Sequence, residues 1–253
     1  MMTTDCPQVG AFLDAAVIQH GPRDLLRRFF SWADLAAKQR GVSLSFAPLD
    51  ELVDVNRANA ATWRPLLPLF NPALSGITPR TGFALLGRNG NGDVVAAQAA
   101  RLYDWSTTSL YNEAASLRMF YRDVGAARDR GDMCELATPA AHSISGRVVF
   151  SGGGWYRPDY RGTGLGHVIP RISRAYAFTR WASDFTISVM AAAVVAGGFA
   201  ERAGYTNVAA GALCMQISPV GVVQGGALVW IESAQLLADL DTICGSRRLS
   251  DHR

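Results

Sequence analysis

The 253-residue chain is predicted to fold as a mixed α/β domain, with helices covering a central sheet. Three observations support this. The composition is 49% hydrophobic, enough for a substantial core. Helical and strand patterns alternate along most of the chain. One clear hairpin, GFALLGRNGNGDVVAAQAARLYDW (82–105), joins two apolar runs through turn-forming Asn and Gly residues, which excludes a wholly parallel sheet.

The first third of the chain is mainly helical. Apolar residues at helical spacing predict helices over 10–40, divided at Gly21-Pro22. The alternating segment from Ser43 to Pro48 predicts a short strand. A helix is expected from about Asp50 to Trp63, and the proline-rich segment TWRPLLPLFNPALSGITPR then predicts a loop or a broken helix before the hairpin.

Residues 106–146 interrupt the alternating pattern. They contain a predicted helix, SLYNEAASLRMFYRDV, followed by a polar Arg/Asp stretch and a loop rich in Pro, Ala and Ser. This segment is too long for a simple connection. It is interpreted either as a lid-like insertion that shapes a pocket or as an oligomer contact.

The second half of the chain alternates again. The segment GRVVFSGGGWY predicts a strand that ends in glycines, and a helix follows the glycine-rich turn. A buried strand is expected from Phe185 to Ala192. A helix from Val194 to Ala203 should end at Gly204. Two strands, NVAAGALCMQIS and VVQGGALVWIES, and the helix SAQLLADLDTIC complete the pattern.

These elements suggest three parts. Residues 1–42 form an N-terminal helical extension, 43–245 a main domain with the insertion at about 106–146, and 246–253 a loose polar tail.

Charge and cysteine spacing exclude several function classes. The formal net charge of +3, from 24 basic and 21 acidic residues, does not suggest a nucleic-acid-binding protein. The four cysteines (Cys6, Cys134, Cys214 and Cys244) form no paired motif, so no metal site is expected. The N-terminus lacks the basic region of a signal peptide, and no apolar run is long enough to cross a membrane. We expect a soluble cytoplasmic protein.

The glycine-rich turn RGTGLGH (161–167) lies between a strand and a helix, where backbone N–H groups and the helix dipole can bind an anion. Glycines leave room for a diphosphate, while Arg161 adds a charge and Thr163 a hydroxyl. No Lys-Ser/Thr pair follows, which excludes a Walker loop. The glycine spacing and the late position in the chain exclude a dinucleotide fingerprint.

A third motif, [QR]-x-x-G-x-[GA], is matched by Arg161, Gly164 and Gly166, after the lead-in WYRPDYRG. This resembles the acetyl-CoA signature of the GCN5-related N-acetyltransferase (GNAT) superfamily. The segment GGFAERAGY resembles the second signature of that family. The order of elements from Ser43 to about Glu232 is also similar, so the resemblance covers about three quarters of the chain.

The resemblance implies an acyl-CoA N-acyltransferase-like fold, with a mostly antiparallel sheet whose central strand is splayed and bulged. Backbone groups around Gly154 and Tyr156 would then pair with the pantetheine arm of acetyl-CoA. The pyrophosphate would be held by the turn and the start of the helix: Arg161, Gly162, Thr163, Gly164, Leu165, Gly166 and His167. Arg171 or Arg174 would either reach the ribose phosphate or be solvated helix residues. Pro170 is expected within the first turn of the helix, where its missing N–H costs little.

The sequence indicates the acid and base of acetyl transfer less clearly than the residues that would bind the cofactor. The family's usual acid, a Tyr after the aromatic of the second signature, is replaced by Ala200, and the usual Asn by Ala193. The central strand has no carboxylate to act as a base. Five residues could supply protons, each with a surface or packing role as the alternative: Asp104, Glu135, His142, Tyr160 and Tyr205. The catalytic residues are therefore unassigned.

The resemblance implies transfer of an acetyl group from acetyl-CoA to a primary amine of a small molecule or a protein. Two alternatives remain: a non-catalytic module that binds acyl-CoA, or a transferase of another acyl group. The acceptor pocket is expected opposite the cofactor, with walls drawn from Trp63, Arg64, Phe70, Trp105 and Tyr111. Neither nucleic acid nor a membrane is an expected partner, and a homodimer is left open.

Overall fold

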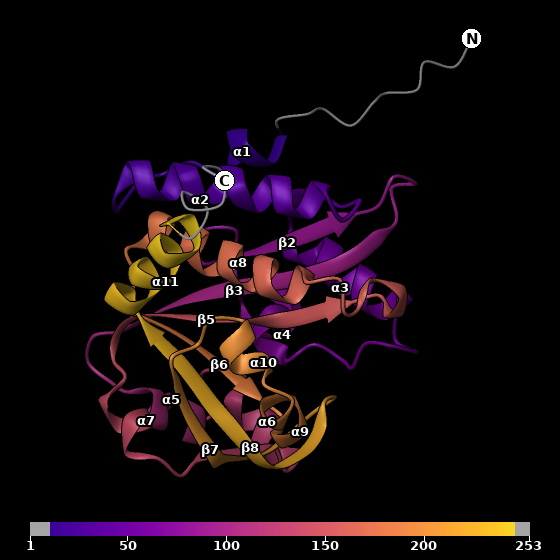
Figure 1. The fold of residues 1–253 in the computed structure, drawn as a ribbon. Helices are drawn as coiled ribbons and strands as arrows, with labels where there is room; N and C mark the ends of the chain where they lie inside the picture. Colours follow the sequence, from indigo (N-terminus) through magenta and orange to yellow (C-terminus); the bar gives the residue numbers. More distant parts are fainter. Residues whose placement is uncertain (1–10, 246–253) are drawn as a thin grey trace.

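The computed structural model describes residues 11–245, which are built around an eight-stranded sheet with the order β1-β2-β3-β5-β6-β8-β7-β4 (Figure 1). β5 and β6 are parallel, and every other neighbouring pair is antiparallel. The predicted mixed, mostly antiparallel sheet is therefore confirmed. The strands are β1 (Ser43–Ala47), β2 (Gly82–Arg88), β3 (Val94–Trp105), β4 (Met133–Leu136), β5 (Gly146–Tyr156), β6 (Phe185–Met190), β7 (Asn207–Ile217) and β8 (Gly221–Glu232).

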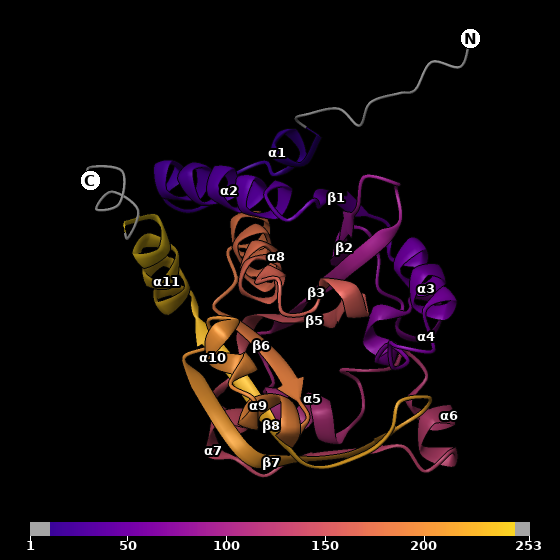
Figure 2. The same ribbon diagram turned by 45° about the vertical axis from the view of Figure 1, so that its right-hand side comes forward.

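Helices cover both faces of the sheet (Figure 2). One apolar core lies beneath α1 (Ala11–Ala15), α2 (Arg23–Lys38), α8 (Leu165–Trp181), α10 (Phe199–Arg202) and α11 (Ser233–Gly245). The other lies beneath α3 (Leu49–Ala58), α5 (Leu110–Ala115), α6 (Val124–Asp129) and α7 (Pro139–Ser143). The short helices α4 (Pro72–Ser75) and α9 (Ala192–Ala196) and the 3-10 turns η1 (Pro68–Phe70) and η2 (Pro158–Tyr160) complete the fold.

The β2–β3 hairpin has the turn that its sequence predicts. The side chain of Asn89 accepts hydrogen bonds from the backbone N–H groups of Asn91 (3.0 Å) and Asp93 (2.9 Å). Gly92 takes φ of +86°, a conformation that glycine adopts without steric cost. Local side-chain chemistry therefore fixes this turn.

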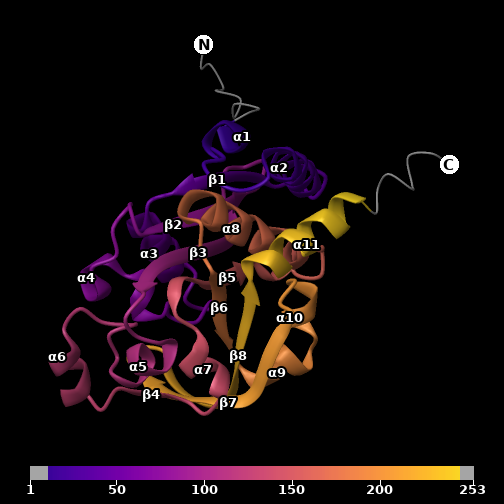
Figure 3. The same ribbon diagram turned by 90° about the vertical axis from the view of Figure 1, so that its left-hand side faces the viewer.

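The structure corrects the prediction for residues 106–146. The long helix expected over SLYNEAASLRMFYRDV (109–124) is limited to α5, after which Leu117 adopts φ of +68°, and α6 begins only at the last residue of that segment. The segment also contributes an unforeseen strand, β4, which pairs with β7 and forms the edge of the sheet (Figure 3). The sequence Met133–Leu136 does not alternate between polar and apolar residues, because the exposed Met133 is apolar, and the run is too short to be distinctive.

Three helix boundaries also differ from expectation. α3 ends at Ala58 rather than near Trp63. The helix expected over 194–203 is two short helices, because Gly198 adopts φ of +71°. Pro170 lies beyond the first turn of α8, which begins at Leu165.

No helix within residues 11–245 is long and apolar enough to cross a membrane. Cys6 and the predicted polar tail at 246–253 lie outside the described residues.

Candidate functional site

The central strands β5 and β6 separate partway along their length. They pair from Val148 with Phe185 to Phe150 with Ile187, and no further. Both strands continue, β5 to Tyr156 and β6 to Met190. This is the splay that the family resemblance implied. It leaves the β6-facing edge of Ser151–Tyr156 without a neighbouring strand in the described part of the chain, so a ligand rich in amide groups could pair with it.

A glycine bulge lies in the same part of β5. Trp155 is opposite Ala97 and Gly152 is opposite Ala99, so Gly153 and Gly154 together face Gln98. Gly153 has φ of +62°, and a Cβ on Gly154 would lie 2.9 Å from Oε1 of Gln98. The bulge thus requires the glycines that the sequence provides. Gly154 is exposed, and its backbone is open to a ligand.

The strand leads through η2 into the turn of residues 161–164 and then into α8. Gly162 and Gly164 adopt φ of +74° and +88°. Within residues 11–245, the backbone N–H groups of 162–166 donate no hydrogen bond, while His167 N–H bonds to the carbonyl of Gly164 (3.0 Å). Free N–H groups in sequence at the start of a 17-residue helix form an anion-binding surface.

Two side chains of the turn have structural roles that were not predicted. The guanidinium of Arg161 donates to the carbonyls of Tyr156 (3.1 Å) and Thr62 (3.3 Å). The hydroxyl of Thr163 donates to the carbonyl of Tyr160 (2.8 Å). Arg161 thereby joins the end of β5 to the 60–65 segment. A hollow of about 470 Å³ is lined by Arg161 and residues 60–65.

Arg40 is an additional cation that sequence reasoning missed. It follows α2 in the N-terminal region, and its Nε donates to the carbonyl of Thr163 (2.6 Å). A second bond from Nη1 to the carbonyl of Ala36 (2.6 Å) fixes the side chain. A Cβ on Gly164 would lie 3.0 Å from Nη2 of Arg40. No local sequence pattern could reveal a contact that spans 123 positions.

Arg171 and Arg174 are not solvated, nor are they available to a ribose phosphate. Arg171 is 4% exposed and pairs with Asp239 of α11 through bonds of 2.7 and 3.1 Å. It also donates to the carbonyl of Arg202 at the end of α10 (2.5 Å). Both arginines occupy the inner side of α8 because α10 and α11 cover that side, which the sequence of α8 alone does not indicate.

Arg174 is fully buried, with its guanidinium over the ring of Tyr205 (4.5 Å). It donates to the carbonyl of Ala203, but its Nε and Nη1 have no partner within the described residues. The hydroxyl of Tyr156 is likewise buried without a partner. Burial lowers the pKa of Arg174 and raises that of Tyr156. These groups form a costly polar cluster beneath the turn.

His167 is the ionisable group on the first turn of α8. Its Nδ1 lies 3.1 Å from the carbonyl oxygen of Arg202 and from Nη1 of Arg171. Partial burial, followed by the neighbouring Arg171 charge, lowers the pKa of the imidazole below its usual 6.5. The ring is therefore largely neutral at pH 7.

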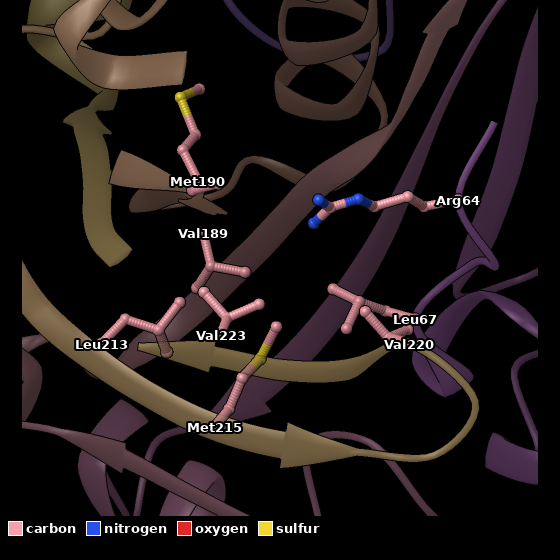
Figure 4. Close-up of a pocket in the computed structure, with 9 residues that line it drawn as sticks. Arg64, Leu67, Val189, Met190, Leu213, Met215, Val220 and Val223 are labelled. Atoms are coloured by element: carbon pink, nitrogen blue, oxygen red, sulfur yellow. The ribbon is translucent and has the colours of Figure 1, made fainter. Parts of the chain in front are cut away.

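A small cavity of about 160 Å³ lies at the free end of β6 (Figure 4). Apart from Arg64, its lining side chains are aliphatic or thioether groups, and Trp63 and Arg64 line the neighbouring hollow of about 470 Å³. The expectation of an acceptor pocket with aromatic walls stays a prediction. Of the residues suggested from the sequence, Arg64 lines it, whereas Phe70, Trp105 and Trp63 are buried in the core. The lining residues are Arg64, Leu67, Val189, Met190, Ala191, Leu213, Met215, Val220 and Val223.

None of the five candidate proton-transfer residues lines this cavity. Asp104, Glu135 and His142 are exposed, and His142 stacks on Tyr111 with the ring centroids 4.0 Å apart. Tyr160 lies under the guanidinium of Arg157 (5.2 Å), and Tyr205 lies under Arg174. The residues that line the cavity include no general base.

Two residues of the insertion, Tyr121 and Asp132, are hydrogen-bonded to the β7–β8 turn beside the cavity. The hydroxyl of Tyr121 donates to the carbonyl of Ser218 (2.8 Å), and the carboxylate of Asp132 accepts from the N–H of Ser218 (2.9 Å). Ser218 lies in the β7–β8 turn, two residues before Val220, a wall residue. This geometry favours a pocket-shaping role for residues 106–146.

No protein-family model matches the chain, and no curated protein sequence matches it significantly. Solved structures that superpose on it include a spermidine/spermine N-acetyltransferase mutant from Vibrio cholerae (9% identity, 78% of this chain, 97% of that chain, TM-score 0.46). NAA60 from Arabidopsis thaliana with acetyl-CoA is 12% identical over 76% of this chain and 99% of that chain, with a TM-score of 0.42. RimJ from Mycobacterium smegmatis with CoA-disulfide is 10% identical over 80% of this chain and 88% of that chain, with a TM-score of 0.43. Likenesses this weak assign no function, so function must be inferred from the chain's own geometry.

Proposed function

We propose that the chain is an acetyl-CoA-dependent N-acetyltransferase that acts on a primary amine. One observation carries the proposal: the open edge of β5 leads directly to the free N–H groups at the start of α8. A ligand with an amide-bearing arm and a diphosphate would match both parts in order. The match of Arg161, Gly164 and Gly166 to the GNAT acetyl-CoA motif identifies coenzyme A as that ligand.

The residues that would hold acetyl-CoA follow from their positions. Gly154 and Tyr156 offer backbone groups to the pantetheine arm. Backbone N–H groups from Arg161 to His167 would surround the diphosphate, although those of Arg161 and His167 bond to the carbonyls of Pro158 and Gly164. Arg40 adds a positive charge beside Gly164. We retain 43–245 as the catalytic domain, with 1–42 as an extension that contributes Arg40.

The bound co-substrate supplies an activated thioester. In the overall reaction, a C–N bond forms as the C–S bond breaks. Starting from an ammonium group, one proton ends on the CoA thiol and one passes to solvent. The chain's own contribution is positioning. The slot between the separated ends of β5 and β6 would hold the thioester, and the cavity beside β6 would hold the amine. No side chain is assigned as acid or base, because Ala200 and Ala193 replace the family's usual groups and the cavity has no carboxylate.

Calorimetry with acetyl-CoA tests the first half of the proposal. We expect binding to the full chain, and its absence at millimolar acetyl-CoA would overturn the proposal. Release of CoA thiol in the presence of an amine panel tests the second half. Comparison of acetyl-, succinyl- and longer acyl-CoA tests the choice of acyl group.

The absence of an assigned acid and base also favours a second candidate, a module that binds acyl-CoA without turnover. The two candidates predict the same binding but differ in thiol release. Release that depends on an added amine would exclude the non-catalytic module.

A further inference from the structure

The cavity beside β6 has one polar feature, the guanidinium of Arg64. Figure 4 shows this side chain extending toward the other lining residues, with its guanidinium above Leu67 in this view. No hydrogen bond or ion pair joins it to another residue in the described range 11–245. Arg64 is exposed, so its guanidinium at the edge of an apolar cavity is open to solvent and can pair with an anion.

The backbone that carries Arg64 is fixed on both sides. The carbonyl of Arg64 accepts a bond from the side chain of Asn56 (2.9 Å), whose Oδ1 lies 3.3 Å from the N–H of Leu66. The preceding Trp63 stacks on Trp155 of β5, with centroids 5.0 Å apart and planes at 7°. The base of the side chain is thus anchored, while the guanidinium remains free.

The cavity also lies close to the open slot. Val189 and Met190 belong to the part of β6 beyond Ile187, where β6 has separated from β5. A thioester held in the slot would therefore lie near the β6 wall. This step rests on the proposed function.

The charges of the residues that line the cavity favour some amines over others as acceptors. The lining contains one guanidinium and no carboxylate, so a polyamine would meet repulsion and would lose hydration without compensation. A carboxylate could pair with both arms of the Arg64 fork. The apolar walls and the nearby positive charge also favour the neutral form of an amine, the form that attacks a thioester.

From these points we infer that the acceptor is a small amine that carries a carboxylate and an apolar body, as an aliphatic amino acid does. Arg64 binds the carboxylate, and the β6–β8–β7 wall takes the apolar part. The thioether groups of Met190 and Met215 adapt to its shape. Arg64 is a specificity-determining residue in this assignment.

The test compares matched acceptors with the full chain. Leucine and isopentylamine differ by one carboxylate, as do valine and isobutylamine, and spermidine serves as a polycation. We expect kcat/KM for thiol release to be at least about tenfold higher for each amino acid, the usual scale of a charge-assisted hydrogen bond. Arg64→Met should remove that preference and leave the KM for acetyl-CoA unchanged. Arg57→Met is the control, because Arg57 is exposed and pairs with Asp54 on α3.

Binding gives a second readout that does not need turnover. With CoA at saturation, calorimetry should detect N-acetylleucine but not N-isopentylacetamide, and Arg64→Met should lose the difference. Equal binding of the two products, or a raised KM for acetyl-CoA in Arg64→Met, would overturn the inference and leave the acetyltransferase proposal intact. Failure of the unaltered chain to bind CoA would overturn both.

Discussion

Gly166 and Phe199 lie in direct contact: a Cβ on Gly166 would be 3.0 Å from Cε2 of the Phe199 ring. Gly166 is the last residue of the acetyl-CoA motif, and Phe199 belongs to the segment that resembles the second family signature. The two motifs are therefore parts of one packed unit, in which α8 begins against α10. The position of the turn depends on this contact.

Gly164→Glu should abolish CoA binding while the protein remains folded. The substitution brings a carboxylate and a larger side chain to the free N–H groups of the turn. Because Gly164 has φ of +88°, it also adds backbone strain of about 1–3 kcal/mol. Calorimetry with CoA measures the loss.

Gly92→Glu provides the matched control for that strain, since Gly92 has φ of +86° and no atom near its Cβ position. It should destabilise the chain similarly and still bind CoA. If Gly164→Glu binds CoA as the unaltered chain does, the diphosphate does not lie at this turn.

Arg171 and Arg174 should differ sharply when each is replaced by Met. Arg171→Met leaves the carboxylate of Asp239 largely buried without its partner, so we expect a loss of about 3 kcal/mol in the free energy of unfolding. Arg174→Met removes a buried charge that has one hydrogen bond within residues 11–245, so its effect should be much smaller or stabilising. Urea denaturation measures both. Equal losses for the two variants would contradict this reading of the cluster.

Protonation of His167 should depend on the cofactor. Without CoA, its NMR titration should give a pKa below 6.5, because burial and Arg171 disfavour the imidazolium. Since the folded pKa is lowered, the unfolded chain takes up the proton first, and this residue's contribution to stability falls as pH decreases below about 6.5.

A bound diphosphate should raise the pKa of His167. Unchanged titration of His167 on addition of CoA would place the phosphates elsewhere.

Asp132→Asn should loosen the β7–β8 turn from the insertion. Burial alone would raise the pKa of Asp132, but the neighbouring Tyr121 hydroxyl and the N–H of Ser218, which donates to its carboxylate (2.9 Å), bring the pKa below its usual 3.8. The bond from Ser218 also holds the turn, so its weakening should speed amide hydrogen exchange at 217–223 by about tenfold or more. The stabilisation is present above the usual pKa and is lost as pH falls through the lowered value.

Asp129→Asn is the control for that experiment, because Asp129 is exposed at the end of α6. It should leave exchange at 217–223 unchanged. Equal exchange in both variants would show that Asp132 does not restrain the turn.

The parts of the fold with strong local signals were predicted well. The hairpin turn at Asn89, the strand before the glycine turn and α8 all have residue patterns that permit few conformations. The splay of β5 from β6 followed from the family resemblance, and no residue pattern alone would have indicated it.

The missed features depend on long-range packing. β4 is a four-residue strand that exists because β7 offers it an edge. Arg171 is buried because α11 places Asp239 beside it, 68 positions further along the chain. Arg40 has an ordinary local sequence, and only the tertiary fold shows that it lies beside Gly164.

The bond from Arg40 to Thr163 limits how the chain can be shortened. A fragment that began at Ser43 would retain every strand and every residue of the acetyl-CoA motif, yet it would lack the cation beside Gly164. It would also uncover the apolar side of α8 on which Phe29, Phe30 and Ala33 of α2 share a core with Ile169 and Ile172. We therefore expect a shortened form of this protein to fold and to keep the turn in place only if it retains α2 and Arg40.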